Sequence, residues 1–324
     1  MARYKQIDLS GIKTIPIASR KSKVTPRDFA RVLRNPGSAR VQEFVDSLPR
    51  ILVGSELRRL AADIAGAKKK KKPVIVMMGA HVVKVGLSPV IIDLLEQGIV
   101  THLAMNSAAA IHDMETAMWG HTSEDVAVNL MDGRFGMSRE TGEFINKCLT
   151  KAFLESTEGY GEALGKKIVA LKARNQKLSL LAACHRLHVP VTVHAAIGTD
   201  IVHQQPTMDG AATGELSFRD FKILANSVKD LKGGGVVVNV GSAVILPEVF
   251  LKALTVARNL GYKAKGFSTA NFDMIRQYRP SVNVVERPTR GSGIGYNFIG
   301  HHEIMIPLLA VMVKLALHQG RSSR

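Results

Sequence analysis

Short runs of apolar, β-branched residues alternate with amphipathic stretches along most of the chain. The run PVIVMMGA, residues 73–80, is typical of a strand that is buried on both faces. A helix is predicted after it, because Ser88 and Pro89 suit a helix start and Gly98 suits a helix end. A second buried strand is predicted at about residues 101–105. Two strands joined by a crossover helix should be parallel, and the crossover right-handed.

The same alternation returns in the second half of the chain. Strands are predicted at residues 190–198, 233–243 and 262–270, with a further candidate at 281–288, and helices at 217–229 and 247–260. Between the second and third strands the pattern is helical instead, with helices predicted at 139–155, 160–175 and 178–188. This order predicts an α/β fold, with one doubly wound, mostly parallel, Rossmann-like sheet of about six or seven strands flanked by helices.

The N-terminal residues have a different pattern. Residues 1–70 predict an extended arm with a short helix over 25–35, followed by two helices broken near Pro49. We expect this region to pack on the core or on a neighbouring subunit, and residues 71–324 to form the α/β domain.

Composition places the chain among ordinary globular proteins, with 46% hydrophobic and 22% charged residues. No apolar run is long enough to span a bilayer, and the first residues lack the apolar core of a secretory signal. We therefore expect a cytoplasmic protein that does not bind membranes. Cys148 and Cys184 have no metal or redox spacing, so buried thiols are expected.

The formal charge of +17 is the strongest bulk feature of the chain. Much of it comes from the first fifty residues and from Lys68 to Lys72, a run between a helix end and the first strand, where solvated cations are favoured. No aromatic residue adjoins the run Lys68 to Lys72, and aromatic residues do not alternate regularly with the N-terminal basic residues, as a binder of single strands would need. Nucleic acid is therefore not the expected partner.

Polar residues that suit catalysis follow the predicted strands. Because the carboxyl ends of parallel strands meet at one edge of a sheet, these residues should share a crevice. They are His81 and Lys84, then Asn106, His112, Asp113 and Glu115, then His194, Asp200 and His203, then Asn239 and Ser242, and finally Thr269, Asn271 and Asp273.

Several common motifs are missing. The sequence has no GxGxxG after the first strand, no HExxH or facial-triad spacing, and no GxSxG, so neither a metal site nor a catalytic triad is expected. The polar loop at residues 203–215 is a candidate lid. Gly291, Gly293 and Gly295 predict either an anion-binding nest or a flexible connector.

The segment GAHVVKVGLSPVIIDLLEQGIVTHLAMNSAAAIHDMETAM resembles the deoxyhypusine synthase family. Residues 106–109 stand where that family has Thr-Ala-Gly-Gly, and His112-Asp113 where it has an acidic pair. The segments PVTVHAAIGTD, GGGVVVNV and GFSTANFD follow in the family's order, so the resemblance covers about residues 74–289.

The resemblance implies an NAD-binding sheet in a homotetramer with sites at subunit interfaces. Together with the loops at the strand ends it predicts a set of cofactor-binding residues, which are Gly79, Ala80, His81, Gly86, Asn106, Ser107, Ala108, Asp113, Asp200, Gly234, Gly235, Thr269 and Ala270.

The sequence departs from the family where that family's chemistry happens. The family's catalytic lysine lies in a Trp-Gly-Lys motif, whereas the comparable stretch VVERPTR has Arg287 and no lysine, and Asn239-Val240 replaces a His-His pair. An arginine stays protonated and cannot form the imine that the family uses.

These observations predict an NAD-dependent transferase or oxidoreductase that acts on a small substrate other than the spermidine and translation-factor pair; the charge of the chain leaves an anionic substrate open. His112, His194 and His203 are the candidates for the catalytic proton, and Arg287 occupies the lysine's place. Three alternatives remain: a non-catalytic scaffold or regulator that binds NAD or another nucleotide, an aminobutyl transferase of the deoxyhypusine synthase type, and an RNA-associated basic protein.

Overall fold

The computed structural model describes residues 3–319, and within them six strands form a single sheet. Their order across the sheet is β3-β2-β1-β4-β5-β6, and every neighbouring pair is parallel. The strands are β1 (Val74–Met78), β2 (His102–Asn106), β3 (Val191–His194), β4 (Val236–Val240), β5 (Ser268–Asp273) and β6 (Ile294–Ile299). This is the doubly wound, Rossmann-like sheet that the sequence predicts.

The chain divides into two compact units, Met1–Ser55 and Glu56–Arg324. In the first unit the short elements are η1 (Ile17–Ser19), η2 (Pro26–Asp28) and α1 (Val41–Ser47). The helix predicted over residues 25–35 is only the single turn η2, in which Asp28 Oδ2 accepts hydrogen bonds from the amide and hydroxyl of Thr25. That prediction was too long, since no apolar residue of the segment is fully buried and Phe29 and Val32 are exposed.

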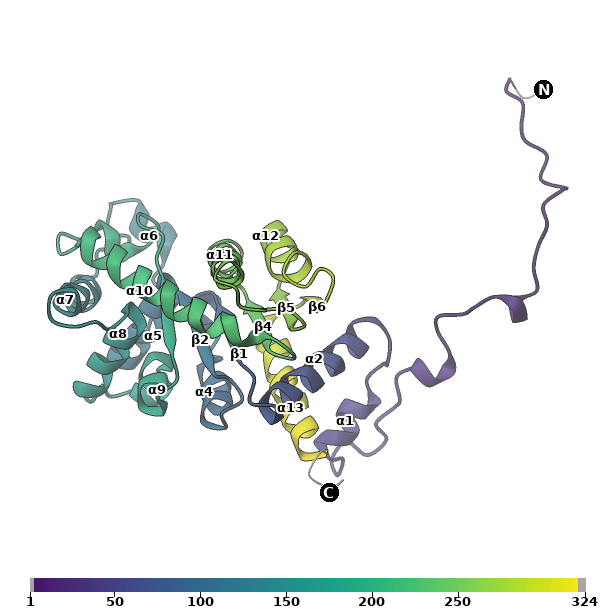
Figure 1. Ribbon diagram of the computed structural model, residues 1–324, viewed down its shortest axis with the longest axis horizontal. Coiled ribbons are helices and arrows are strands. Elements are labelled where there is room, and N and C mark those ends of the chain that lie inside the picture. The colour runs from purple at the N-terminus through teal and green to yellow at the C-terminus, as the bar shows by residue number, and fades with distance from the viewer. Residues whose placement is uncertain (1–2, 320–324) are drawn as a thin grey trace. The chain divides into compact units, whose positions relative to one another are not determined.

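Helices of the second unit cover both faces of the sheet. One face carries α10 (Gly210–Val228), α11 (Ile245–Asn259) and the π-helical turn η6 (Ser281–Glu286), and Phe250 of α11 packs there against Ile75 and Val237. The other face carries α4 (Ser88–Glu96), α13 (His302–Gln319) and the later turns of α2 (Leu52–Lys69), which enclose Val74, Val76 and Val238. Figure 1 shows α11 above the strands, and α4 and α13 below them.

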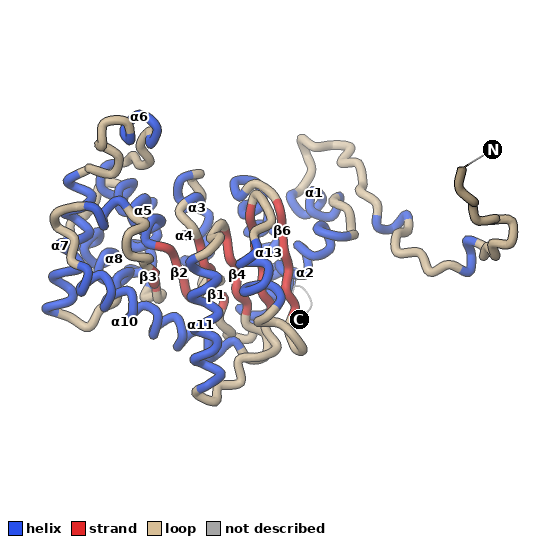
Figure 2. The backbone as a smooth tube through the Cα atoms, turned by 90° about the horizontal axis from the view of Figure 1, so that it is seen from above, coloured by secondary structure: helices blue, strands red, loops and turns tan. Residues whose placement is uncertain are grey.

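The helical insertion between β2 and β3 is present as predicted. It contains α5 (Ser107–Trp119), α6 (Val126–Leu130), α7 (Arg139–Glu155), α8 (Tyr160–Ala170), η3 (Gln176–Leu178) and α9 (Leu180–Leu187). In Figure 2 the strands are seen along their length, with α6 beyond their carboxyl ends. The remaining short elements of the unit are α3 (His81–Lys84), η4 (Ile201–Gln204), η5 (Lys229–Leu231) and α12 (Tyr278–Pro280).

The last two strands differ from the prediction. β5 begins six residues later than predicted, at Ser268, and residues 281–288 lie in η6 and the turn after it and form no strand. The sixth strand is Ile294–Ile299, so Gly295 is a strand residue. A Cβ on Gly295 would lie 2.2 Å from the carbonyl oxygen of Val285, so this glycine lets η6 approach the sheet and forms no anion nest.

Buried amides explain why β5 and β6 are hard to recognise. Asn239, Asn271 and Asn297 are in register on three adjacent strands. The amide of Asn239 donates to Asn271 Oδ1 at 2.8 Å, and the amide of Asn271 donates to Asn297 Oδ1 at 2.9 Å. This ladder pairs both polar atoms of the Asn271 side chain inside the fold, while Asn239 Oδ1 has no partner within the described residues. Because such polar residues lie inside them, these strands lack the continuous apolar pattern of β1.

No helix within the described residues is long and apolar enough to cross a membrane.

A buried carboxylate joins the helical insertion to the sheet. Asp220 of α10 is fully buried, and its Oδ2 accepts from the amides of Val193 at 2.6 Å and Gly161 at 2.9 Å. Its Oδ1 has no hydrogen-bond partner among residues 3–319. Burial raises the pKa of Asp220 to about 8, against the opposing effect of these amide donors.

We predict that Asp220→Asn becomes more stable relative to the wild type as the pH rises from 5.5 to 7.5. An unfolded aspartate loses its proton near pH 4, whereas the folded one keeps it to about pH 8, so the wild type loses stability across this interval. The free energy of unfolding of Asp220→Asn minus that of the wild type should rise by at most about 1.4 kcal/mol per pH unit. Urea unfolding of both proteins at the two pH values measures it, and a difference independent of pH would contradict it.

Candidate functional site

A cavity of about 800 Å³ opens at the carboxyl edge of the sheet beside β2 and β3. Its walls come from α5, the segment 121–138, the start of α7 and the loop after β3. The side-chain amide of Gln204 donates to the carbonyl oxygen of Phe135, and that of Gln205 to the carbonyl oxygen of Gly136, both at 2.6 Å. These bonds hold the 121–138 segment against the loop after β3. In the polar loop at residues 203–215, a candidate lid, the loop extends only to Asp209, because α10 begins at Gly210.

Helix α5 places the central side chains of the pocket. Asn106 caps the helix, its Oδ1 accepting from the amide of Ala109 at 3.0 Å. Small residues follow at the first turn, and Ala108 leaves the wall of the pocket open there. His112 and Glu115, three residues apart, lie on the same side of α5 and both line the pocket.

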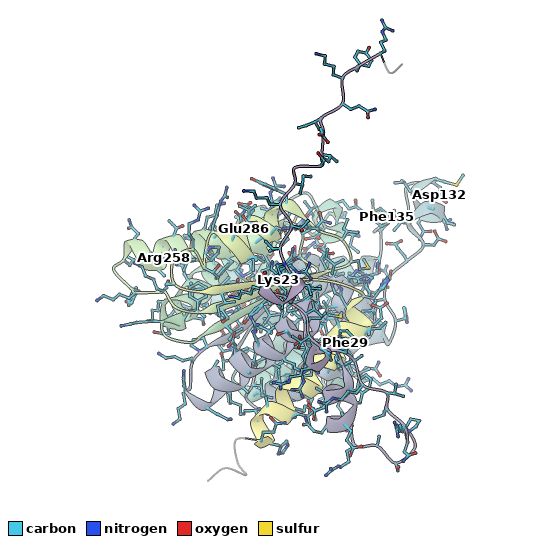
Figure 3. All side chains as sticks on the ribbon, turned by 90° about the vertical axis from the view of Figure 1, so that its right-hand side faces the viewer. Lys23, Phe29, Asp132, Phe135, Arg258 and Glu286 are labelled. Atoms are coloured by element: carbon cyan, nitrogen blue, oxygen red, sulfur yellow. The ribbon has the colours of Figure 1, made fainter. Side chains whose placement is uncertain are left out.

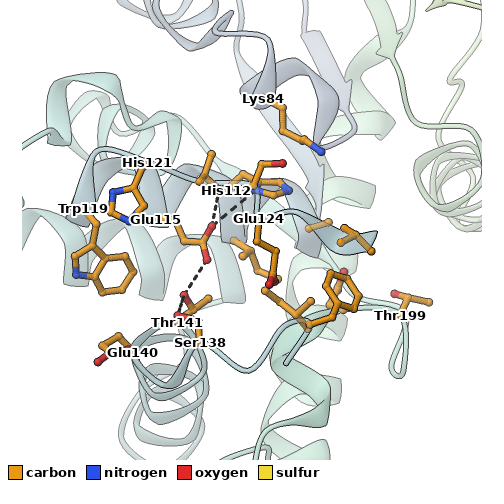
Figure 4. A pocket seen from close by; sticks show the side chains of 18 residues that line it. Lys84, His112, Glu115, Trp119, His121, Glu124, Ser138, Glu140, Thr141 and Thr199 are labelled. Carbon is orange, nitrogen blue, oxygen red and sulfur yellow. Dashed lines mark hydrogen bonds and ion pairs between the residues drawn. The ribbon is translucent and has the colours of Figure 1, made fainter. Parts of the chain in front are cut away.

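Two hydroxyl groups fix the carboxylate of Glu115. Thr122 donates to Oε2, and Thr141 donates to Oε1 at 2.8 Å. Because the Thr122 hydroxyl gives its hydrogen to Glu115, its oxygen can only accept from His112 Nδ1, which is within hydrogen-bond distance. His112 Nδ1 therefore carries the hydrogen, and Nε2 keeps its lone pair. Figure 4 shows His112 and Glu115 side by side in the pocket.

The surroundings of His112 favour its neutral form. Burial lowers the pKa of His112, nearby Lys84 lowers it too, and only Glu115, whose Oε2 lies 3.8 Å from Nδ1, acts in the opposite direction. At neutral pH the side chain is thus an uncharged imidazole that is able to accept a proton at Nε2.

The other two predicted catalytic histidines do not line the pocket. His203 Nδ1 accepts from the amides of Gly198 at 3.1 Å and Asp200 at 3.2 Å, and its buried Nε2 lies 4.0 Å from Asp200 Oδ2. His194 is buried beneath α10, with Nε2 3.0 Å from the hydroxyl of Thr192, and burial lowers its pKa to about 3. The structure does not bring either ring to the pocket surface.

Asp200 does belong to the pocket. The hydroxyl of Ser107, the first residue of α5, donates to Asp200 Oδ2. Burial raises the pKa of Asp200, while Ser107 and His203 act in the opposite direction. Asp200 thus places a carboxyl group at the start of α5, where the helix dipole favours the ionised form of that group.

Asp113, predicted as a cofactor ligand, has a structural role. It is fully buried, and it accepts from the Ser179 hydroxyl at 2.6 Å and from the amides of Leu180 and Leu181 at 2.7 and 3.2 Å. The two backbone amides belong to the first turn of α9, where N–H groups have no partner within the helix. Burial raises the pKa of Asp113 to about 6.

Five further predicted residues lie away from the carboxyl edge. Gly234 and Gly235 precede β4 at the amino edge, and Thr269 and Ala270 are buried inside β5. Arg287 follows η6 and donates to Asn283 Oδ1 at 2.7 Å. The shifted boundary of β5 is the physical reason for Thr269 and Ala270, and the helical η6 is the reason for Arg287. Gly234 and Gly235 miss the crevice because they precede β4, at the opposite edge of the sheet.

The remaining predicted cofactor residues do line the carboxyl edge, beside β1. Gly79 packs so closely on β4 that a Cβ would lie 2.3 Å from the carbonyl oxygen of Gly241. Ala80 and His81 follow, and the His81 ring meets the ring of His302 edge to face, with centroids 5.6 Å apart. Gly86 closes the turn after α3 with a positive φ of 77°.

His302 was not predicted as a cofactor contact. Its Nε2 lies 3.2 Å from the carbonyl oxygen of Phe272, so Nε2 carries the hydrogen and Nδ1 is an acceptor. Nδ1 is buried and has no partner within the described residues. The sequence contained a weak signal, the His-His-Glu at 301–303, but that triplet suggests metal ligands; no group of three potential metal ligands occurs among the described residues.

The pocket is acidic although the chain is basic. Its lining includes four carboxylates, Glu115, Glu124, Glu140 and Asp200, but one lysine, Lys84. Trp119 and Phe135 add aromatic rings to the same wall. Carboxylates with aromatic faces favour a cation, so the anionic substrate that the bulk charge left open is not favoured by this pocket.

The fold and the site define a Rossmann-like α/β protein with a pocket at the carboxyl edge of its sheet. No model of a known protein family matches the chain, and no protein of curated function matches it. Solved structures do resemble it. Unliganded AgrE has a TM-score of 0.52 at 16% identity, covering 81% of this chain and 32% of that chain. The ternary complex of AgrE with ornithine and NAD⁺ gives 0.50 at 14%, covering 83% and 34%.

A protein of Entamoeba histolytica assigned as a deoxyhypusine synthase gives a TM-score of 0.49 at 11% identity, covering 86% of this chain and 94% of that chain. At these identities the AgrE structures show a shared fold alone, and membership of the deoxyhypusine synthase family stays a prediction. The chain spans about a third of the AgrE chains.

We predict opposite shifts in the pKa of His112 from two substitutions. Glu115→Gln removes the negative charge that favours the imidazolium and should lower this pKa, whereas Lys84→Met removes a repelling charge and should raise it. An NMR titration of the His112 ring measures both. Shifts in the same direction would contradict the arrangement around Glu115.

Proposed function

We propose that this protein is an NAD-dependent enzyme, a transferase or an oxidoreductase, that binds a small cationic amine in the pocket and removes a proton from it with His112. The observation that carries the proposal is the unprotonated Nε2 of His112, held by the Thr122 hydroxyl and the Glu115 carboxylate. The substrate is expected to differ from the spermidine and translation-factor pair, because the stretch around Arg287 has no lysine.

The pocket residues divide the work of binding and proton transfer. The carboxylates of Glu124 and Glu140 attract the cationic end of a substrate, and Trp119 offers a ring face to it. His112 Nε2 accepts a proton from the substrate. The imidazolium that forms is stabilised by Glu115, whose oxygens stay fixed by two hydroxyl donors.

The rim beside β1 fits the cofactor better than the pocket does. Four carboxylates in the pocket would repel the pyrophosphate of a dinucleotide. At the rim, Gly79 and Ala80 have small side chains, and the unpartnered Nδ1 of His302 is a buried acceptor that a carboxamide or a ribose hydroxyl would satisfy. We propose that these residues, with His81 and Gly86, hold NAD, which supplies hydride transfer when bound. The AgrE complex with ornithine and NAD⁺ is a fold neighbour that supports this choice.

A transferase of the deoxyhypusine synthase type is a second candidate. It requires a lysine amine for the imine, and Lys84 lines the pocket. Trapping with borohydride in the presence of NAD and an amine distinguishes the two candidates. A covalent adduct that forms in the wild type and is lost in Lys84→Arg supports the imine route. Turnover without an adduct supports direct oxidation.

We predict that His112→Gln lowers kcat by a factor of about 10² to 10⁴, since a positioned general base contributes that much. NAD binding, measured by isothermal titration calorimetry, should be unchanged because His112 lies in the pocket and not at the rim. Turnover is measured as NADH formation with a panel of small amines. The matched control is His318→Gln, an exposed histidine near the end of α13, which should retain activity.

Two results would contradict this proposal. Absence of NAD binding at millimolar concentration would exclude the cofactor. Binding of NAD without turnover of any amine would favour the alternative of a non-catalytic nucleotide-binding scaffold or regulator.

A further inference from the structure

The amino edge of the sheet, opposite the pocket, concentrates positive charge. Four loops lead into the neighbouring strands β1, β4, β5 and β6, and they cover residues 68–73, 229–235, 258–267 and 287–293. These loops contain twelve lysines and arginines and one acidic residue, Asp230. We call this surface the basic edge.

The four loops form one continuous surface. The Lys70 side chain lies beside Gly234, its Nζ 3.8 Å from the position of a Cβ there. The amide of Gly233 donates to the carbonyl oxygen of Lys265 at 3.2 Å. The guanidinium of Arg258 donates to the carbonyl oxygens of Ala264 and Pro288, at 3.0 and 3.1 Å. The loops before β1, β4, β5 and β6 are thereby connected in order. In Figure 3, Arg258 lies at the side of the molecule opposite Asp132.

These cations are not neutralised within the protein. None of the twelve forms an ion pair with another described residue, whereas lysines elsewhere do, such as Lys147 with Glu143 and Lys252 with Glu248. Nine of the twelve are exposed, which are Lys69, Lys70, Lys71, Lys232, Arg258, Lys263, Lys265, Arg287 and Arg290. Mutual repulsion among so many exposed cations is relieved by a polyanion.

Two further features of the basic edge suit a nucleic acid strand. Tyr262 is 45% exposed among these lysines, and the ammonium of Lys229 lies 5.4 Å from its ring centroid. An exposed aromatic ring among cations is a platform on which a base stacks. The glycines at 233, 234, 266 and 291 have positive φ. Because they carry no side chains, a phosphate chain can approach the backbone amides of these loops.

We propose that the basic edge binds single-stranded RNA through its phosphates, with Tyr262 stacking on a base. This function is separate from the pocket at the opposite edge. The sequence did not predict RNA binding, because no aromatic residue adjoins the lysine run in the chain. The fold, however, brings Tyr262 to the same surface as Lys70 and Lys265.

The test uses the full-length protein and a fluorescein-labelled 20-nucleotide oligouridine at 150 mM salt, with anisotropy as the readout. The variant Lys70→Glu, Lys232→Glu, Lys263→Glu, Lys265→Glu should bind at least tenfold more weakly. Its affinity should also depend less steeply on salt, the logarithmic slope falling by roughly 0.7 for each phosphate that the protein no longer neutralises. The matched control changes four exposed lysines of the first unit, Lys5, Lys13, Lys21 and Lys23, to Glu, and should bind almost as well as the wild type.

A second pair of variants tests the stacking contact without changing charge. Tyr262→Ala should weaken binding several-fold, and Tyr262→Phe should not, because stacking needs the ring and not the hydroxyl. Tyr278→Ala, which removes another exposed tyrosine, is the control.

Three outcomes would overturn the proposal. They are no binding to oligouridine at 150 mM salt, equal weakening in both lysine variants, and preferential binding to vesicles containing 30% phosphatidylserine that RNA does not compete away. If the Glu variant unfolds, as judged by circular dichroism, the corresponding Gln variant decides, with a smaller loss of affinity expected.

Discussion

The parallel register of six strands is the constraint on which the rest of the structure depends. Because each crossover returns the chain to the amino edge before the next strand, all six strands end at one edge. Asn106, His194 and Gly79 lie at that edge although up to 115 residues separate them in the sequence. The pocket lies beside β2 and β3 because the crossover between these strands is the long one, and its helices α5 and α7 and the segment between them provide the walls.

The same constraint separates charge. Helix N-termini face the carboxyl edge and helix C-termini face the amino edge, so acids are favoured near the pocket and bases near the opposite edge. Asp200 beside the start of α5 and Lys68 and Lys69 at the end of α2 follow this rule. The dipole accounts for a few charges in the last turn of each helix. It does not account for lysines in the loops beyond, such as Lys263 and Lys265, so the charge of the basic edge exceeds what helix ends require.

Most of the fold could be predicted from the sequence, because β1 to β4 lie in short runs rich in apolar residues and several helices between them begin at recognisable capping residues or prolines. The prediction failed where buried groups are polar. Asn271 lies inside β5, and its amide is satisfied by Asn239 and Asn297, which only the register brings beside it. The strand was therefore placed too early, and Thr269 was assigned to a strand end. Asp113 illustrates the same limit, since its partners at residues 179–181 lie more than sixty residues away.

The catalytic prediction shows what the sequence lacks. In the sequence His112, His194 and His203 are equally good candidates, because each lies near the end of a predicted strand. Their difference lies in whether Nδ1 donates or accepts a hydrogen bond, and in whether the ring lines the pocket. Backbone amides occupy His203 Nδ1, and the core encloses His194, whereas Thr122 occupies only Nδ1 of His112. Thr122 can orient His112 because its own hydrogen goes to Glu115, and that arrangement depends on the turn after α5 returning the chain to the helix. A histidine therefore becomes a candidate base through the side chains that surround it, and those neighbours are known only once the chain has folded.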